Sequence, residues 1–124
     1  MTAVEEHLPA DVTTEVRDGA MWLVMDRPEA FNAMTPGMNV ALTRHMRGSA
    51  IRDDVRVVVL TGAGDAFCAG ADISPDASGV DAIERFDVRA MDAANALVRA
   101  IVECPKPVLA AVNGIAAGVG CSAA

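Results

Sequence analysis

The sequence predicts an α/β domain, and three observations support this prediction. Short apolar runs rich in β-branched residues alternate with longer segments of helical periodicity, which is the order expected when helices cover a sheet. Two of the apolar runs lead directly into glycine-rich loops. Finally, 52% hydrophobic and 22% charged residues over 124 positions suffice for one globular domain with a buried core.

A hairpin is predicted near the N-terminus. Residues 1–12 are polar and mixed, and we expect a flexible terminus there. Residues 13–17 are predicted to form a short strand, and Asp18–Gly19 is a turn signal. Residues 20–26 form a buried strand in this interpretation, which ends before Pro28 because proline cannot donate to a strand ladder.

A helix is predicted to follow. Thr35 is its expected N-cap, and Pro36 suits the first helical position because its backbone N–H is not needed there. Apolar residues then recur at helical spacing at Met38, Leu42 and Met46.

Residues 56–61 (RVVVLT) show no alternation, which predicts a strand covered on both faces. Residues 62–72 are rich in glycine and alanine and are predicted to form a loop. Asp81 is positioned to cap a long helix that Pro105 and Pro107 end. The predicted apolar stripe of that helix consists of Ile83, Phe86, Met91, Ala94, Leu97, Ile101 and Val102.

The last predicted elements are a strand and the start of a helix. Residues 108–112 are predicted to be a buried strand, followed by a turn at Asn113–Gly114. Residues 118–124 have the composition of a glycine loop entering a helix. The sequence stops at Ala124 before that helix shows an apolar stripe or a C-cap, so we expect residues 13–124 to be the N-terminal part of a larger domain.

Composition excludes several functions. The net charge of -7 and the lack of a Lys/Arg cluster disfavour binding to nucleic acids or to anionic membranes. No apolar run is long enough to span a bilayer, and the N-terminus has no basic region, so we expect a cytoplasmic protein. Cys68, Cys104 and Cys121 are odd in number and lack metal-type spacing, so we expect reduced, buried thiols and no metal site.

The two strand-to-glycine-loop segments, 57–73 and 108–124, are the candidate binding elements. Glycine and alanine let a ligand approach the backbone closely. A dinucleotide fingerprint starting at Gly62 and Gly64 would need a small residue where Phe67 stands, and neither loop holds the lysine of a phosphate-binding loop. Nucleotide binding therefore stays an unfavoured alternative to an oxyanion hole, in which two backbone N–H groups stabilise an oxygen that gains negative charge.

Three motifs, in order, resemble one family. Arg27 to Met34 (RPEAFNAM) resembles the family segment N-R-P-x-x-x-N-A-L. Residues 57–62 with 66–73 resemble its first oxyanion loop, and residues 105–121 resemble its second. Together they cover almost the whole chain, which is therefore similar to the N-terminal half of enoyl-CoA hydratase/isomerase (crotonase) proteins.

The resemblance implies a truncated crotonase-like core built as a spiral of ββα units. It implies oxyanion donors at the amides of Ala71 and Val119, an acyl-CoA thioester as substrate, and no cofactor beyond the CoA of that substrate. It also implies a homotrimer or hexamer for the full-length protein. The residues expected to line the CoA path are Ala30, Ala33, Ala69, Gly70, Ala71, Asp72, Ile73 and Val119. For Asp72, bracing of the loop is an equal alternative.

One departure from the family bears on the reaction. Family hydratases use two glutamates as acid and base, and the first of these positions holds Ser122 here. The second would lie beyond Ala124. We therefore expect an isomerase-like or divergent member rather than a true hydratase, with an inactive fragment as the alternative. Ser122 itself is predicted to cap the last helix rather than to orient a water molecule.

Overall fold

The computed structural model describes residues 11–72 and 88–124. The predicted flexible terminus lies outside the described residues over positions 1–10, and so do Ile73 and the predicted helix start at Asp81. Val12, which the prediction placed in the tail, instead begins the first strand and is buried.

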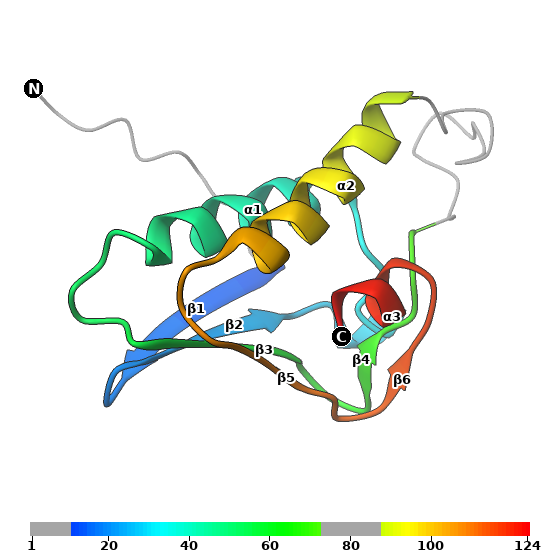
Figure 1. Ribbon diagram of the computed structural model, residues 1–124. Helices are drawn as coiled ribbons and strands as arrows, with labels where there is room; N and C mark the ends of the chain where they lie inside the picture. The colour runs from blue at the N-terminus through cyan, green and yellow to red at the C-terminus, as the bar shows by residue number, and fades with distance from the viewer. Residues whose placement is uncertain (1–10, 73–87) are drawn as a thin grey trace, which may run out of the picture.

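Four strands form the main sheet, in the order β1-β2-β3-β5 (Figure 1). β1 (Val12–Arg17) and β2 (Ala20–Met25) are the predicted antiparallel hairpin. β3 (Val57–Gly62) runs parallel to β2, and β5 (Val108–Ala111) runs parallel to β3. The parallel pairs confirm the predicted α/β class, because each requires a crossover through a helix.

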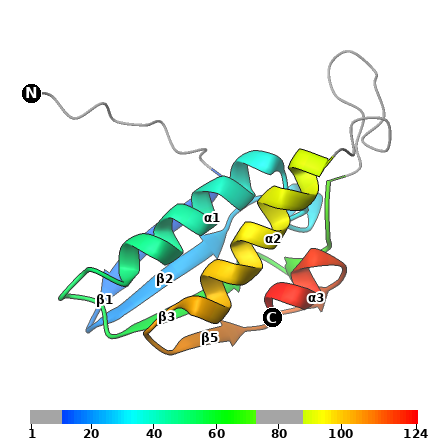
Figure 2. The same cartoon turned by 45° about the horizontal axis from the view of Figure 1, so that its top comes forward.

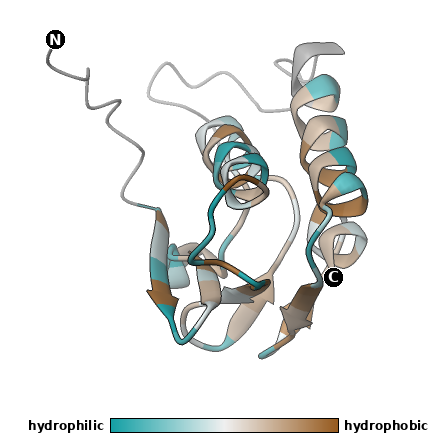
Figure 3. Cartoon of the chain, turned by 60° about the vertical axis from the view of Figure 1, so that its left-hand side comes forward, coloured by the Kyte–Doolittle hydropathy of each residue, from teal (hydrophilic) through white to brown (hydrophobic). Residues whose placement is uncertain are grey.

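Two helices supply these crossovers and lie over one face of the sheet (Figure 2). α1 (Pro36–Ser49) begins as predicted, with the Thr35 hydroxyl oxygen accepting from the Met38 amide at 3.2 Å. α2 (Val88–Glu103) packs beside α1. Hydrophobic segments of the strands and of the helices meet between the two layers (Figure 3). The most deeply buried side chains there include Met21, Leu23, Met25, Met38, Leu42, Met46, Val58, Leu60 and Leu97.

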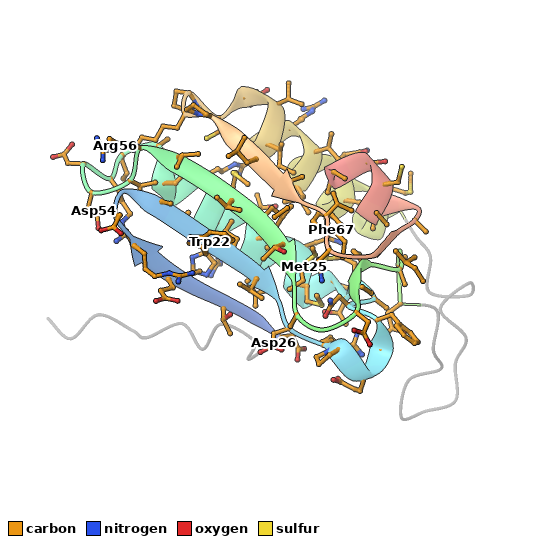
Figure 4. All side chains as sticks on the ribbon, turned by 90° about the horizontal axis from the view of Figure 1, so that it is seen from below. Trp22, Met25, Asp26, Asp54, Arg56 and Phe67 are labelled. Atoms are coloured by element: carbon orange, nitrogen blue, oxygen red, sulfur yellow. The ribbon has the colours of Figure 1, made fainter. Side chains whose placement is uncertain are left out.

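The other face of the sheet is not covered by α1 or α2, and Figure 4 looks onto it. Trp22 alternates with the buried Met21 and Leu23 and so lies on this face, where the Arg17 guanidinium is 5.3 Å from its ring centroid. Leu109, on the edge strand β5, is 56% exposed. The prediction of a buried strand at 108–112 is therefore wrong, because only one face of the edge strand meets the helices.

A second correction concerns α2. Met91 and Val102 were assigned to its apolar stripe, but both are exposed, Val102 by 77%. Among residues 91–103, whose burial the structure describes, Leu97 and Ala100 are the buried side chains of α2. The sequence stripe was drawn too wide, since it spans positions that point in different directions around the helix.

A small second sheet interrupts the two segments that were predicted to be loops. β4 (Ala66–Cys68) pairs in parallel with β6 (Ile115–Ala116). Phe67, in the middle of β4, is fully buried (Figure 4), which explains the large residue that argued against a dinucleotide loop. The short helix α3 (Val119–Ala123) follows β6. Upstream, a single 3-10 turn, η1 (Pro28–Ala30), begins at the proline that ends the hairpin.

Candidate active site

The candidate site lies where the parallel strands of the main sheet end and the small sheet begins (Figure 1). β3 leads through residues 63–65 into β4 and on to Ala71, and β5 leads through residues 112–114 into β6 and on to Val119. The carboxyl ends of parallel strands are the usual place for a ligand in α/β proteins. The pairing of β4 with β6 holds the two glycine loops side by side.

The two loops touch at a pair of glycines. Gly70 has φ +110° and Gly118 has φ +54°, which are values that residues with a side chain rarely adopt. A methyl group on Gly118 would lie 3.5 Å from the Cα atom of Gly70, and one on Gly70 would lie 3.3 Å from the carbonyl oxygen of Ala117. The peptides that precede Ala71 and Val119 therefore adjoin.

The described part of the chain offers no hydrogen-bond partner to the amides of the two predicted donors. Met34 donates to the Gly70 carbonyl at 2.7 Å and accepts from the Asp72 amide at 2.9 Å, so the intervening Ala71 turns its own N–H away from Met34. Val119 is the first residue of α3, and first-turn amides have no partner within a helix. In the described ranges 11–72 and 88–124, no hydrogen bond starts at either amide.

The Arg-Pro segment runs beside the first loop, as the resemblance implied. Ala69 donates to the Phe31 carbonyl at 3.0 Å, next to the Met34–Gly70 hydrogen bond described above. The structure thus brings Ala33, Ala69, Gly70, Ala71 and Asp72 together, with Val119 across the glycine contact. Ala30 lies on η1, at the start of the same segment.

Arg27 holds these two segments to each other. Its Nη1 atom donates to the Ala33 carbonyl at 2.7 Å and lies 3.2 Å from Oδ2 of Asp72. The two charged side chains are only 18% and 20% exposed. Breaking such a mostly buried ion pair leaves an uncompensated charge, which is costly. Of the two interpretations of Asp72, the contacts therefore support bracing of the loop.

Two asparagines contribute more to the site than the sequence suggested. Asn32 is fully buried, with its Nδ2 donating to the carbonyls of Ala63 at 2.9 Å and Ala66 at 2.8 Å. Nδ2 of Asn113 donates to the carbonyls of Gly64 at 2.9 Å and Ala66 at 3.1 Å. The sequence indicates no role for Asn32 beyond its place in a motif, and none for Asn113 beyond its place in a motif and a turn. Their one signal was that each sits inside a family motif.

Two smaller predictions are wrong. Ser122 does not cap α3: the N-cap position is Gly118, and the Ser122 hydroxyl donates to the Gly118 carbonyl at 3.4 Å from within the helix. The thiols are free but not uniformly buried, because Cys121 is exposed and Cys104 half-buried. Burial raises the pKa of the Cys68 thiol, which disfavours a nucleophilic thiolate there.

The described residues form neither a metal site nor a membrane span. No group of three or more His, Cys, Asp or Glu side chains in that part of the chain is arranged to hold a metal ion. None of the helices the structure describes is both long enough and apolar enough to cross a membrane.

The fold defines a class of α/β protein that has a backbone-lined site at the sheet edge. Its features are the strand order, the two crossover helices and the paired glycine loops. The sequence profile named Enoyl-CoA hydratase/isomerase matches residues 15–124, so the chain belongs to this family. This confirms the predicted family.

The names of two individual relatives agree with this family. The chain is 39% identical over 112 residues to a "Probable enoyl-CoA hydratase" of Rhodobacter capsulatus, covering 89% of this chain and 41% of that protein. It is 36% identical over 121 residues to the "1,2-epoxyphenylacetyl-CoA isomerase" of Escherichia coli, covering 91% of this chain and 44% of the relative. The chain thus spans about two fifths of the length of these relatives.

Solved structures confirm the fold class. An enoyl-CoA hydratase from Mycobacterium avium subsp. paratuberculosis superposes with a TM-score of 0.78 at 34% identity, over 93% of this chain and 41% of that chain. The Pseudomonas aeruginosa protein PA4980 superposes with a TM-score of 0.82 at 35% identity, over all of this chain and 51% of that chain.

Proposed function

We propose that this chain forms part of an acyl-CoA site in which the amides of Ala71 and Val119 donate to the thioester oxygen while it carries enolate charge. The observation that supports the proposal is the close approach of Gly70 and Gly118, because the amides of Ala71 and Val119 belong to the peptides that follow these glycines and find no hydrogen-bond partner among the described residues. Such fixed donors need no reorganisation during the reaction, and one of them contributes about 2.7–4 kcal/mol to stabilising the transition state.

The CoA moiety would run along the paired segments formed by the Arg-Pro motif and the first loop. The first loop is rich in glycine and alanine, and the Arg-Pro segment contributes Ala30 and Ala33, so a ligand can reach the backbone there. Ala30, Ala33, Ala69, Gly70, Ala71, Ile73 and Val119 are the proposed lining residues. Asp72 joins them through its backbone, since its carboxylate is engaged by Arg27.

We further propose isomerase-like or divergent chemistry in preference to hydration. Addition of water needs groups that accept and donate protons. Ser122 stands where the resemblance implies a glutamate, and its hydroxyl is turned back toward the Gly118 carbonyl within α3. The alternative is that these 124 residues bind a thioester without turning it over. A homotrimer or hexamer and a cytoplasmic location remain part of the proposal for the full-length protein.

Val119→Pro tests the donor role directly. Proline is well tolerated at the first position of a helix, so this substitution removes the N–H while preserving the start of α3. Val119→Ala is the matched control, because it trims the side chain and keeps the N–H. The ligand is butyryl-CoA with a ¹³C-labelled thioester carbonyl, which has no double bond to hydrate.

The measurements are the affinity by calorimetry and the carbonyl stretching frequency by infrared difference spectroscopy. We expect the wild type and Val119→Ala to lower the carbonyl frequency of the bound thioester and Val119→Pro to lose much of that shift. Equal shifts in the proline and alanine variants would rule out the Val119 donor. Failure of the folded wild type to bind butyryl-CoA would reject the thioester site in this chain.

A further inference from the structure

Two asparagines from distant parts of the chain bind one carbonyl oxygen. The Ala66 carbonyl accepts from Nδ2 of Asn32 at 2.8 Å and from Nδ2 of Asn113 at 3.1 Å. Asn32 lies within the Arg-Pro motif, Ala66 begins β4, and Asn113 lies between β5 and β6. This one carbonyl oxygen therefore links three segments that are far apart in the sequence.

The orientation of each amide is fixed by its other contacts. Oδ1 of Asn32 accepts from the Arg27 amide at 2.8 Å, and Oδ1 of Asn113 accepts from the Gly62 amide at 3.2 Å. An asparagine has one acceptor oxygen and two donor hydrogens, so these contacts leave each NH₂ group directed at carbonyls. The second hydrogens bind Ala63 and Gly64, the residues that lead into β4.

The shared carbonyl lies upstream of both proposed donors. From Ala66, β4 leads directly to Gly70 and Ala71. From Asn113, β6 leads directly to Gly118 and Val119, and Ala66 is paired with Ile115 in the small sheet. Any slip of Asn113 relative to Ala66 would therefore move one donor loop against the other.

We propose that Asn32 and Asn113 are positioning residues that set the relative placement of the Ala71 and Val119 amides through the Ala66 carbonyl. Their importance for catalysis rests on the proposed function of those amides, but the mechanical link does not. A misplacement of about 1 Å in such a site lowers a rate on the order of 100-fold, so a link of this kind determines how well two separate loops act on one oxygen.

Asn113 is the better residue to test, because it is exposed and water can replace its hydrogen bonds without loss of the fold. Asn113→Ala removes the donors and the acceptor. Asn113→Asp keeps an oxygen for the Gly62 amide and loses both donors, since an ionised carboxylate only accepts. Thr61→Val is the control: it removes a hydroxyl that donates to the Ala111 carbonyl at 2.8 Å and lies 3.5 Å from Oδ1 of Asn113. It leaves in place both Nδ2 donations of Asn113, to the Gly64 and Ala66 carbonyls.

The first measurement needs no ligand. Chemical shifts and residual dipolar couplings of the Ala71 and Val119 N–H groups report their orientation in the ¹⁵N-labelled chain. We expect both amides to change in Asn113→Ala and Asn113→Asp and neither to change in Thr61→Val. Unchanged couplings at both sites in a folded Asn113→Ala chain would overturn the inference, and so would a wild-type pattern in Asn113→Asp.

The second measurement is the infrared stretching frequency of the labelled butyryl-CoA carbonyl. A purely structural role of Asn113 would leave this frequency unchanged. The carbonyl frequency shift should shrink in both Asn113 variants and persist in Thr61→Val. If the couplings change as expected while the wild type leaves the carbonyl frequency unshifted, the proposed function fails and the positioning link stands. If the wild type shifts the carbonyl and both Asn113 variants shift it equally, the positioning role is refuted and the proposed function stands.

Discussion

Replacing Asn32 with alanine should destabilise the chain more than any other single change of a polar side chain at the site. Asn32 is 0% exposed and makes three hydrogen bonds to the backbone. Alanine would leave the Arg27 amide and the Ala63 carbonyl without this partner, whereas the Ala66 carbonyl would keep Asn113. The φ of +57° at this position adds strain, because asparagine adopts left-handed backbone more readily than alanine.

The magnitude follows from these contacts. A buried polar group left unpaired costs about 1–3 kcal/mol, so two such groups cost roughly 2–6 kcal/mol, with the low end favoured because both are only partly buried. Left-handed strain adds about 1 kcal/mol. We therefore expect a loss of about 3–5 kcal/mol in the free energy of unfolding, a large share of the 5–15 kcal/mol typical of a domain.

Urea denaturation followed by circular dichroism measures this loss, with two comparison variants. Asn32→Gly removes the same hydrogen bonds but tolerates the positive φ, so it should be about 0.5–1 kcal/mol less harmful than alanine. Asn113→Ala, at the exposed end of the same cluster, should cost about 1 kcal/mol or less because water replaces its partners. The reasoning fails if Asn32→Ala costs no more than Asn113→Ala.

Two further predictions concern stability. A methyl group on Gly120 would overlap the Cys68 carbonyl oxygen, so Gly120→Ala should lower the melting temperature. Gly48 lies inside α1 with nothing within 4 Å of an added methyl group, so Gly48→Ala should instead stabilise the chain by about 0.5–1 kcal/mol. Equal effects of the two substitutions on stability would contradict the packing argument. Burial, and then the charge of Arg52, lower the pKa of His45 from its ordinary value of 6.5, so the unfolded chain binds more protons than the folded chain between that lowered pKa and about 6.5. The free energy of unfolding should therefore fall as the pH drops through 6.5, and this fall should be missing from His45→Gln measured over the same pH range. The same pH profile in both chains would show that His45 does not cause the fall.

Local signals explain what the sequence could predict. Thr35, Pro36 and the spacing of Met38, Leu42 and Met46 define α1 within a single stretch of chain, so cap, start and buried face are all correct. The hairpin is equally local. The extent of burial is not: Leu109 belongs to an apolar run, but whether its face is covered depends on which elements lie over an edge strand.

The small sheet and the asparagines were missed for a related reason. β4 and β6 are too short to show an alternating pattern, and each exists because the other lies beside it. Asn113 next to a glycine has the composition of a turn, and its long-range bonds to the 62–66 segment leave no trace in the neighbouring residues. The placement of Ala71 and Val119, by contrast, was available from the motif, while their role as donors stays a prediction.

In a site made of backbone amides, the residue type matters at the neighbours of the donor positions more than at the donor positions themselves. Ala71 and Val119 need only an N–H, whereas Gly70 and Gly118 must adopt left-handed backbone where the loops touch. Proton transfer, in contrast, needs particular side chains, and the position where the family places its first glutamate holds Ser122. In the proposed site, carbonyl polarisation by the two amides and proton transfer by side chains therefore depend on different groups. Hydration of an enoyl thioester needs both properties, so a failed hydration assay would not test the two proposed donors, whereas the frequency of a bound carbonyl does.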